Sequence, residues 1–176
     1  MTTEYLLNRE VELILAALTP SNRLVLRVSL HTGLRLGDVL ALRPECLRPV
    51  FWVTEAKTGK RKRVGLPGPL LEDLRANSGE KWVFPARCDP NKHRTRQAVW
   101  ADVKRAAKAF RLPQNVGPHS FRKVYAVELL QRYGDIERVR RALNHSNDVV
   151  TMVYAMADQQ LRAKYRRRRG RTSTCS

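Results

Sequence analysis

The residues best suited to chemistry lie near the C-terminal end of the chain, in the stretch from Gly117 to Tyr154. His119 and Arg122 are three residues apart on a predicted helix, so their side chains point the same way. His145 follows in a polar turn, and Tyr154 comes nine residues after it. Guanidinium groups bind phosphate oxygens through paired hydrogen bonds, and a phenol that sheds its proton is a nucleophile. This order of residue types indicates a site for covalent chemistry on a phosphate group.

A second group of candidate residues lies in the segment HTGLRLGDVLALRP, residues 31–44. A turn at Thr32 and Gly33 places Arg35 at the start of a short predicted helix that also carries Asp38. The helix dipole favours anions at that end, so local preference does not explain an arginine there. An arginine beside free backbone N–H groups suits a bound phosphate. The plainer interpretation, in which Arg35 pairs with Asp38, stays open from the sequence.

A basic β-hairpin is predicted further along the chain. Val50–Glu55 and Arg63–Leu66 have β-type residues, and the turn Lys57–Lys60 joins them with Gly59 at its tight position. Five of the seven residues from Lys57 to Arg63 are basic, which is typical of a solvated hairpin that grips backbone phosphate. The residues interpreted in this way are Lys60, Arg61, Lys62 and Arg63.

The overall charge indicates a polyanionic partner. The 176 residues include 34 Lys and Arg against 16 Asp and Glu, which gives a formal net charge of +18. Each cation that neutralises a phosphate releases a counterion, so nucleic acid is the partner that this excess favours. The apolar runs are too short for a membrane span. The three cysteines have no metal-like spacing and indicate incidental thiols in a reducing cytoplasm.

Taken together, these motifs resemble the signature of the tyrosine recombinases, the phage integrase family. T-G-x-R with an acid three residues later, A-K-T-G-K, H-x-x-R, L-x-H and T-x-x-Y occur in the family's order. The acid is Asp38, where Glu is the commoner choice. The resemblance implies site-specific cleavage and rejoining of duplex DNA through a 3′-phosphotyrosine intermediate, without metal, cofactor or ATP. It also implies a homo-tetramer on DNA, a monomer or weak oligomer in solution, and a nucleoid-associated location in the cytoplasm of a prokaryote.

The resemblance assigns roles to the residues that would do the chemistry. Tyr154 attacks the scissile phosphate, while Arg35 and Arg122 stabilise the charge of the transition state. Lys57 protonates the departing 5′-oxygen, a task that suits an ammonium able to lose its proton when buried beside cations. Lys60 is its nearest rival for this role.

Four other residues complete the predicted site. His119 either exchanges the proton of the nucleophile or holds the phosphate, and His145 donates a hydrogen bond to the phosphate. Asp38 orients its neighbours rather than contacting DNA, and Lys123 is a further DNA contact.

The predicted fold is mainly α with one small β-hairpin, an α+β class similar to the catalytic domain of the family. The helix over residues 22–31 is apolar nearly all round and is expected at the centre of the core. Asn8 is expected to cap the first helix. A catalytic domain is expected over residues 1–160 and a basic, flexible tail over 161–176. The other predicted helices cover 69–77, 95–110, 118–133 and a short segment after Gly134.

Two sets of alternatives remain at this point. Tyr125, Tyr133 and Tyr165 compete for the role of nucleophile, but the first two occupy an apolar helix face, which is typical of core residues, and the third lies in the basic tail. A DNA-binding module without catalysis and a type IB topoisomerase would also explain the charge. The complete set of candidate residues favours an enzyme, and residues 156–165, which could dock on a neighbouring protomer, favour a recombinase.

Overall fold

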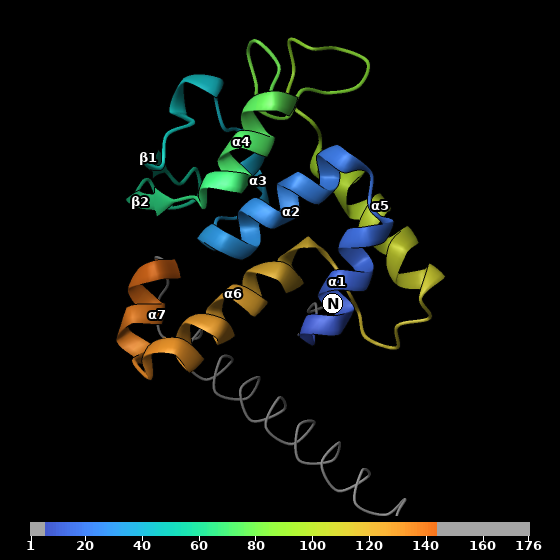
Figure 1. Ribbon diagram of the computed structural model, residues 1–176, viewed down its shortest axis with the longest axis vertical. Coiled ribbons are helices and arrows are strands. Elements are labelled where there is room, and N and C mark those ends of the chain that lie inside the picture. The colour runs from blue at the N-terminus through green and yellow to red at the C-terminus, as the bar shows by residue number, and fades with distance from the viewer. Residues whose placement is uncertain (1–5, 144–176) are drawn as a thin grey trace, which may run out of the picture. The chain divides into compact units, whose positions relative to one another are not determined.

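The computed structural model of the chain describes residues 6–143 (Figure 1). The prediction of a mainly helical fold with a small hairpin is confirmed. The chain divides into two compact units, Met1–Tyr125 and Ala126–Ser176, and the division falls within a single helix. The elements of the described residues are α1 (Asn8–Ala17), α2 (Pro20–Thr32), α3 (Leu36–Leu40), the 3₁₀ helix η1 (Pro44–Cys46), β1 (Val50–Thr54), β2 (Arg61–Gly65), α4 (Gly68–Asn77), α5 (Arg96–Ala109), α6 (Pro118–Tyr133) and α7 (Ile136–Leu143).

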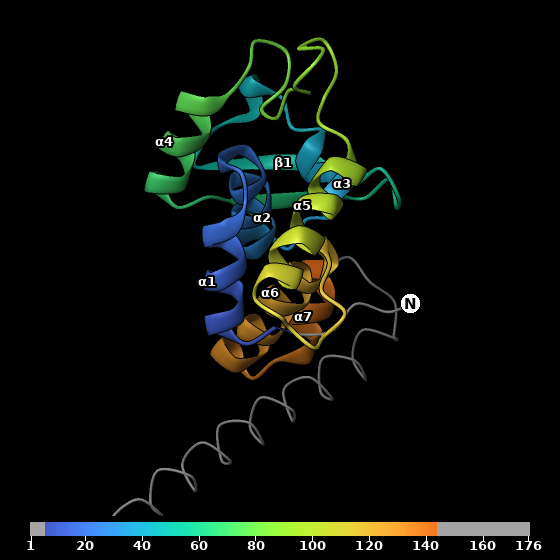
Figure 2. The same cartoon turned by 90° about the vertical axis from the view of Figure 1, so that its right-hand side faces the viewer.

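Helix α2 is the centre of the first unit. Its side chains Val25, Leu26 and Val28 are fully buried, and the helix contacts α1, α3, α4 and β2. Helices α4 and α5 lie on opposite sides of it (Figure 2). The expectation of a central helix is therefore confirmed, since a helix that is apolar nearly all round is stable only when other elements cover it.

The turn after α2 is held in one conformation by local hydrogen bonds. Gly33 adopts the left-handed conformation, with φ of 62°, and its N–H donates to Ser29 O at 2.8 Å. The Thr32 hydroxyl donates to Val28 O at 2.7 Å and accepts from Leu34 N at 3.2 Å. This turn leads directly into Arg35, the N-cap residue of α3, as the sequence predicts.

Strands β1 and β2 form an antiparallel hairpin in which inward and outward side chains alternate. Its inward positions include Phe51, Val53, Lys62 and Val64. The predicted turn is also confirmed, since Gly59 has a φ of 65° and its N–H donates to Glu55 O at 2.9 Å. Strand β2 begins two residues earlier than predicted because the ladder continues across the Glu55 N to Lys60 O hydrogen bond.

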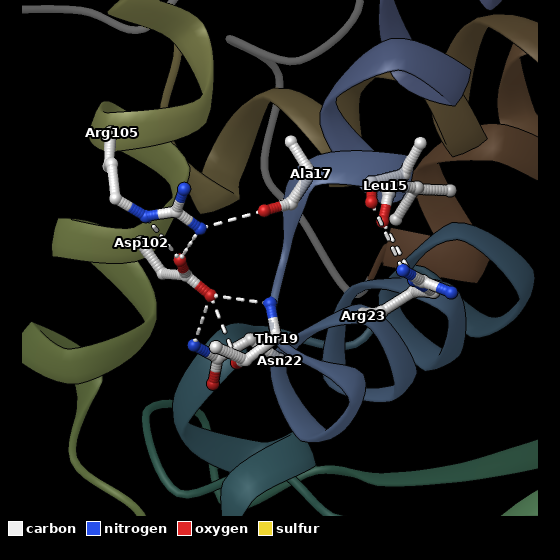
Figure 3. Close-up of polar contacts among 8 residues, drawn as sticks. Leu15, Ala17, Thr19, Asn22, Arg23, Asp102 and Arg105 are labelled. Carbon is white, nitrogen blue, oxygen red and sulfur yellow. Dashed lines mark hydrogen bonds and ion pairs between the residues drawn. The ribbon is translucent and has the colours of Figure 1, made fainter. Parts of the chain in front are cut away.

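The carboxylate of Asp102 ties α5 to the start of α2 (Figure 3). Its Oδ2 accepts from Thr19 N and Thr19 Oγ1 at 3.0 Å and from Asn22 Nδ2 at 2.8 Å. Its Oδ1 accepts from Arg105 Nη2 at 2.5 Å. Burial opposes ionisation of Asp102, but the hydrogen bonds from Asn22, Arg105 and Thr19 outweigh it, so the pKa lies below its ordinary value. Asp102 therefore fixes how two of the helices that carry the core meet.

Two details of the helices differ from the predictions. The N-cap of α1 is Leu7 rather than Asn8, because the Glu10 carboxylate accepts from Leu7 N at 2.7 Å. Tyr133 is not a core residue: it is 42% exposed in the last turn of α6, and the Arg138 guanidinium lies 3.6 Å from its ring centroid. Cation–π contact stabilises an aromatic ring at the surface, so apolar spacing alone was misleading there.

Helix α6 ends at Gly134, as predicted. Gly134 has a φ of 65°, and its N–H donates to Leu130 O at 2.7 Å. Asp135 Oδ1 then accepts from Glu137 N and Arg138 N, which begins α7. None of the helices within residues 6–143 is long and apolar enough to cross a membrane.

Candidate active site

Arg35 is anchored by a carboxylate that the sequence analysis missed. Arg35 Nη1 lies 2.6 Å from Glu55 Oε2, and the Arg35 side chain is 18% exposed whereas that of Glu55 is completely buried. Arg35 therefore forms its ion pair with Glu55, and not with Asp38 as the plainer prediction had it. Glu55 continues the inward alternation of Phe51 and Val53, and this period of two was the signal that could have revealed it.

Asp38 instead connects α3 to the hairpin turn. Its Oδ1 accepts from Ala56 N at 3.0 Å, and the residue is only 5% exposed. Because Asp38 is buried, its carboxylate contacts atoms inside the protein. The role of orienting residue that the resemblance implies for Asp38 stays a prediction.

Arg122 is bound to the same turn that precedes Arg35. It is 3% exposed, and its Nη1 donates to Gly33 O at 2.6 Å. Burial, and then the charge of Arg35, lower the pKa of Arg122 to about 10, while the charges of Glu55 and Asp38 act in the opposite direction. Arg122 stays protonated at neutral pH, and the two guanidinium groups are close enough to affect each other electrostatically.

His119 lies on the same side of α6 as Arg122, as predicted. Both residues line a cavity of about 370 Å³ in the first unit. Unlike Arg122, His119 is exposed, so its imidazole is accessible to a ligand. Apolar residues contribute most of the remaining wall, namely Leu34, Leu36, Trp100 and Pro118.

Two lysines of the hairpin, Lys57 and Lys62, differ from their predicted environments. Lys57 lies in the exposed turn, so the burial beside cations that was expected of a proton donor is not found there. Lys62 is the buried lysine: it is 8% exposed, and its Nζ donates to Thr32 O at 2.6 Å. Burial and the charge of Arg122 lower the pKa of Lys62 to about 8, with Glu55 acting in the opposite direction.

Whether Lys62 contacts DNA stays a prediction, but the expectation that it is solvated is wrong. The physical reason is strand alternation, since Lys62 shares the inward face of β2 with Val64. Lys60, Arg61 and Arg63 are exposed, as predicted.

Lys123 is also buried rather than displayed to a ligand. It is 6% exposed because this part of α6 is buried on every side, from Ser120 to Val124. Lys123 is therefore not a surface cation, and its contact with DNA stays a prediction.

The other two catalytic candidates, His145 and Tyr154, lie outside the described residues. The same is true of Tyr165 and of the basic tail. Among residues 6–143, no three His, Cys, Asp or Glu side chains gather in a way that could hold a metal ion.

Residues 4–160 match the Phage integrase family. The integrase of Escherichia phage P2 is 30% identical over 156 residues, which are 87% of this chain but only 43% of the P2 protein. The chain thus spans less than half the length of that relative.

Solved structures share the fold at lower identity. The XerA recombinase superposes with a TM-score of 0.72 at 19% identity, over 94% of this chain and 64% of its own. The catalytic domain of bacteriophage HP1 integrase superposes with a TM-score of 0.66 at 20% identity, over 89% of this chain and 88% of its own. The architecture is that of a tyrosine recombinase catalytic domain, and the matched region includes every motif described above. The chain belongs to the phage integrase family.

Proposed function

We propose that this protein cleaves and rejoins DNA strands at specific sites through a covalent 3′-phosphotyrosine intermediate formed by Tyr154. The observation that carries the proposal is the arrangement of Arg35 and Arg122. Arg122 Nη1 donates to Gly33 O, two residues before Arg35, and the Arg35 guanidinium pairs with the buried Glu55, so each guanidinium group is held by a partner inside the protein. Two cations held in this way are preorganised to stabilise the charge that develops on a phosphate under attack.

The leaving and attacking oxygens need proton transfer in addition to charge stabilisation. Lys57 protonates the departing 5′-oxygen, and its position in an exposed turn lets the side chain reach DNA that lies on the surface. His119, exposed beside Arg122, holds the phosphate or accepts the proton of Tyr154, and His145 adds a hydrogen bond to the phosphate. A phenolate is a better leaving group than an alkoxide, so the covalent link preserves the energy of the broken bond and rejoining needs no ATP.

Duplex DNA is the proposed partner, and a homo-tetramer on DNA is the proposed assembly. Structures of lambda integrase have been solved as a dimer bound to a core site and as a tetramer bound to a Holliday junction. The net charge of +18 and the exposed Lys60, Arg61 and Arg63 suit binding of a phosphate backbone. Such a protein would act in the cytoplasm, at the nucleoid.

The test is covalent adduct formation. The protein is incubated with nicked duplexes that carry candidate sites, so that a short product strand diffuses away and traps the intermediate, and adducts are separated on a denaturing gel. We expect an adduct with the wild-type protein and none with Tyr154→Phe, which keeps the ring but lacks the nucleophilic oxygen. DNA binding by the Phe variant should be nearly unchanged.

Three outcomes would change the proposal. Binding without any adduct favours the non-catalytic module, and relaxation of supercoiled DNA without recombination favours a topoisomerase. Cleavage that EDTA abolishes and magnesium restores would replace the tyrosine mechanism with that of a metal-dependent nuclease.

A further inference from the structure

One buried oxygen atom connects the two halves of the proposed site. Glu55 Oε2 lies 2.6 Å from Arg35 Nη1 and accepts from Thr58 Oγ1 at 3.0 Å. Thr58 is the residue next to Lys57 in the hairpin turn. The same carboxylate oxygen therefore contacts the arginine that would bind the phosphate and the turn that carries the proposed proton donor.

The backbone of the turn closes around Glu55. Glu55 O accepts from Gly59 N at 2.9 Å and from Thr58 N at 3.3 Å, while Glu55 N donates to Lys60 O at 3.0 Å. A second tie comes from Asp38, which accepts from Ala56 N. Lys57 is the residue between these anchored positions, so its backbone is fixed while its side chain is exposed.

The charge of Glu55 also suits this position. The residue is completely buried, and its charge favours the protonated forms of both Lys62 and Arg122. Buried cations of like charge repel one another, and a buried carboxylate beside them offsets that repulsion. Glu55 thus keeps the cations of the site together before any phosphate is bound.

We propose that Glu55 is a positioning residue that holds Arg35 and the Lys57-bearing turn in one fixed arrangement, with Thr58 as the link to the turn. The proposal rests on the function proposed above. One carboxylate thus places both the cation that stabilises the phosphate and the lysine that protonates the leaving oxygen. Thr58 affects only the placement of the lysine.

Two variants separate the two halves. Thr58→Val removes the hydroxyl that donates to Glu55 but leaves the Arg35–Glu55 pair. Glu55→Gln keeps the shape of the side chain but removes the charge that holds Arg35 and the turn. Thr54→Val is the matched control, because Thr54 is an exposed threonine of the same hairpin. Glu45→Gln is the control for loss of an exposed carboxylate. Melting temperatures establish that each variant is folded.

Cleavage is measured in single turnovers on ordinary DNA and on DNA with sulfur in place of the bridging 5′-oxygen. A thiolate leaves without protonation, so a defect in the placement of Lys57 disappears on the sulfur-bridged strand. We expect Thr58→Val to slow cleavage of ordinary DNA by roughly 10- to 100-fold, the scale of a small misplacement, and to approach the wild-type rate on the sulfur-bridged strand. Glu55→Gln should be slowed on both substrates, because Arg35 is also released. The controls should match the wild type.

Hydrogen exchange in the DNA-free protein gives a readout independent of activity. We expect the amides of Thr58 and Gly59 to exchange several-fold faster in both variants than in the wild type or the controls. If the wild-type protein forms no adduct at all, the proposed function fails while this measurement still tests whether Glu55 anchors the turn.

Certain results would overturn the inference itself. Unchanged exchange in Thr58→Val and Glu55→Gln would show that Glu55 does not anchor the turn. Wild-type cleavage of ordinary DNA by both variants, or an equal loss on the two substrates for Thr58→Val, would show that the anchor does not position Lys57.

Discussion

The two faces of the β1–β2 hairpin carry similar side chains in opposite environments. On the inward face, Lys62 is buried and its ammonium is fixed on Thr32 O. On the outward face, Arg61 and Arg63 are exposed, and the Arg61 guanidinium lies 5.2 Å from the centroid of the exposed Trp52 ring. A run of basic residues therefore has no single role, because strand alternation places one cation in the protein interior and the next one in water. A buried cation needs partners inside the protein, whereas an exposed cation interacts mainly with mobile ions and ligands.

The largest effect should come from removing a cation on the buried side of the site. Arg122→Ala should slow adduct formation on the order of 10³-fold, because it removes a preorganised donor for the transition-state charge. Arg61→Ala, the matched exposed arginine, should change the cleavage rate constant very little when the protein is saturating. Single-turnover kinetics at saturating protein measure both. Equal losses in the two variants would contradict the distinction between buried and exposed cations.

Substitution of Lys57 should have the next largest effect on the cleavage rate, and it tests whether an exposed cation can be catalytic. Lys57→Ala should slow cleavage of ordinary DNA by roughly 10²-fold, the lower end for loss of a general acid. The sulfur-bridged strand should restore most of the rate, whereas it should not restore Arg35→Ala. If Lys60→Ala rather than Lys57→Ala shows this rescue, the proton donor is three residues further along the turn.

The buried lysine should be visible in the pH dependence of stability. The pKa of Lys62 is about 8 in the folded protein against an ordinary value of 10.5, so between these values the unfolded chain binds more protons than the folded one. Stability contributed by Lys62 is therefore low below pH 8 and rises as the pH increases toward 10.5. Relative to Lys62→Met, the wild type should gain roughly 2 kcal/mol in unfolding free energy between pH 7.5 and 9.5.

Denaturant unfolding of both proteins across that pH range is the measurement. Lys60→Met is the control, because Lys60 is exposed in the same hairpin and should show no comparable difference. A difference between wild type and Lys62→Met that is constant with pH would contradict the burial of a charged ammonium at this position.

The smallest effects should come from the exposed cations. Each of Lys60→Ala and Arg63→Ala should weaken DNA binding only a few-fold and should reduce the slope of log K against log salt by about 1. Lys62→Met should leave that slope nearly unchanged, since its ammonium is already bound to Thr32 O. Binding isotherms at several salt concentrations distinguish the two classes, and an equal change of slope for Lys62 would place its ammonium on DNA.

Much of the fold could be predicted because local rules agree with the tertiary structure. The glycines at 33, 59 and 134 all adopt positive φ where the sequence predicts a helix end or a tight turn. Helix α6 has the predicted bounds, and Arg35 is at the start of α3. His119 and Arg122 share one side of α6 and line one cavity. Each of these features depends on residues within a few positions of one another, so the order of residues carries the information.

The amino-acid sequence by itself determined the family, the order of the candidate catalytic residues and the turns that present them. Only the tertiary structure decided which charges are buried and what they contact. Arg35 pairs with Glu55, 20 positions away, and Arg122 binds Gly33 O, 89 positions away. Lys62 reaches Thr32 O for the same reason: the hairpin packs against α2, and their contact excludes water from one face. The environment of a charge depends on every element packed around it, and hydrophobic spacing within one segment does not contain that information.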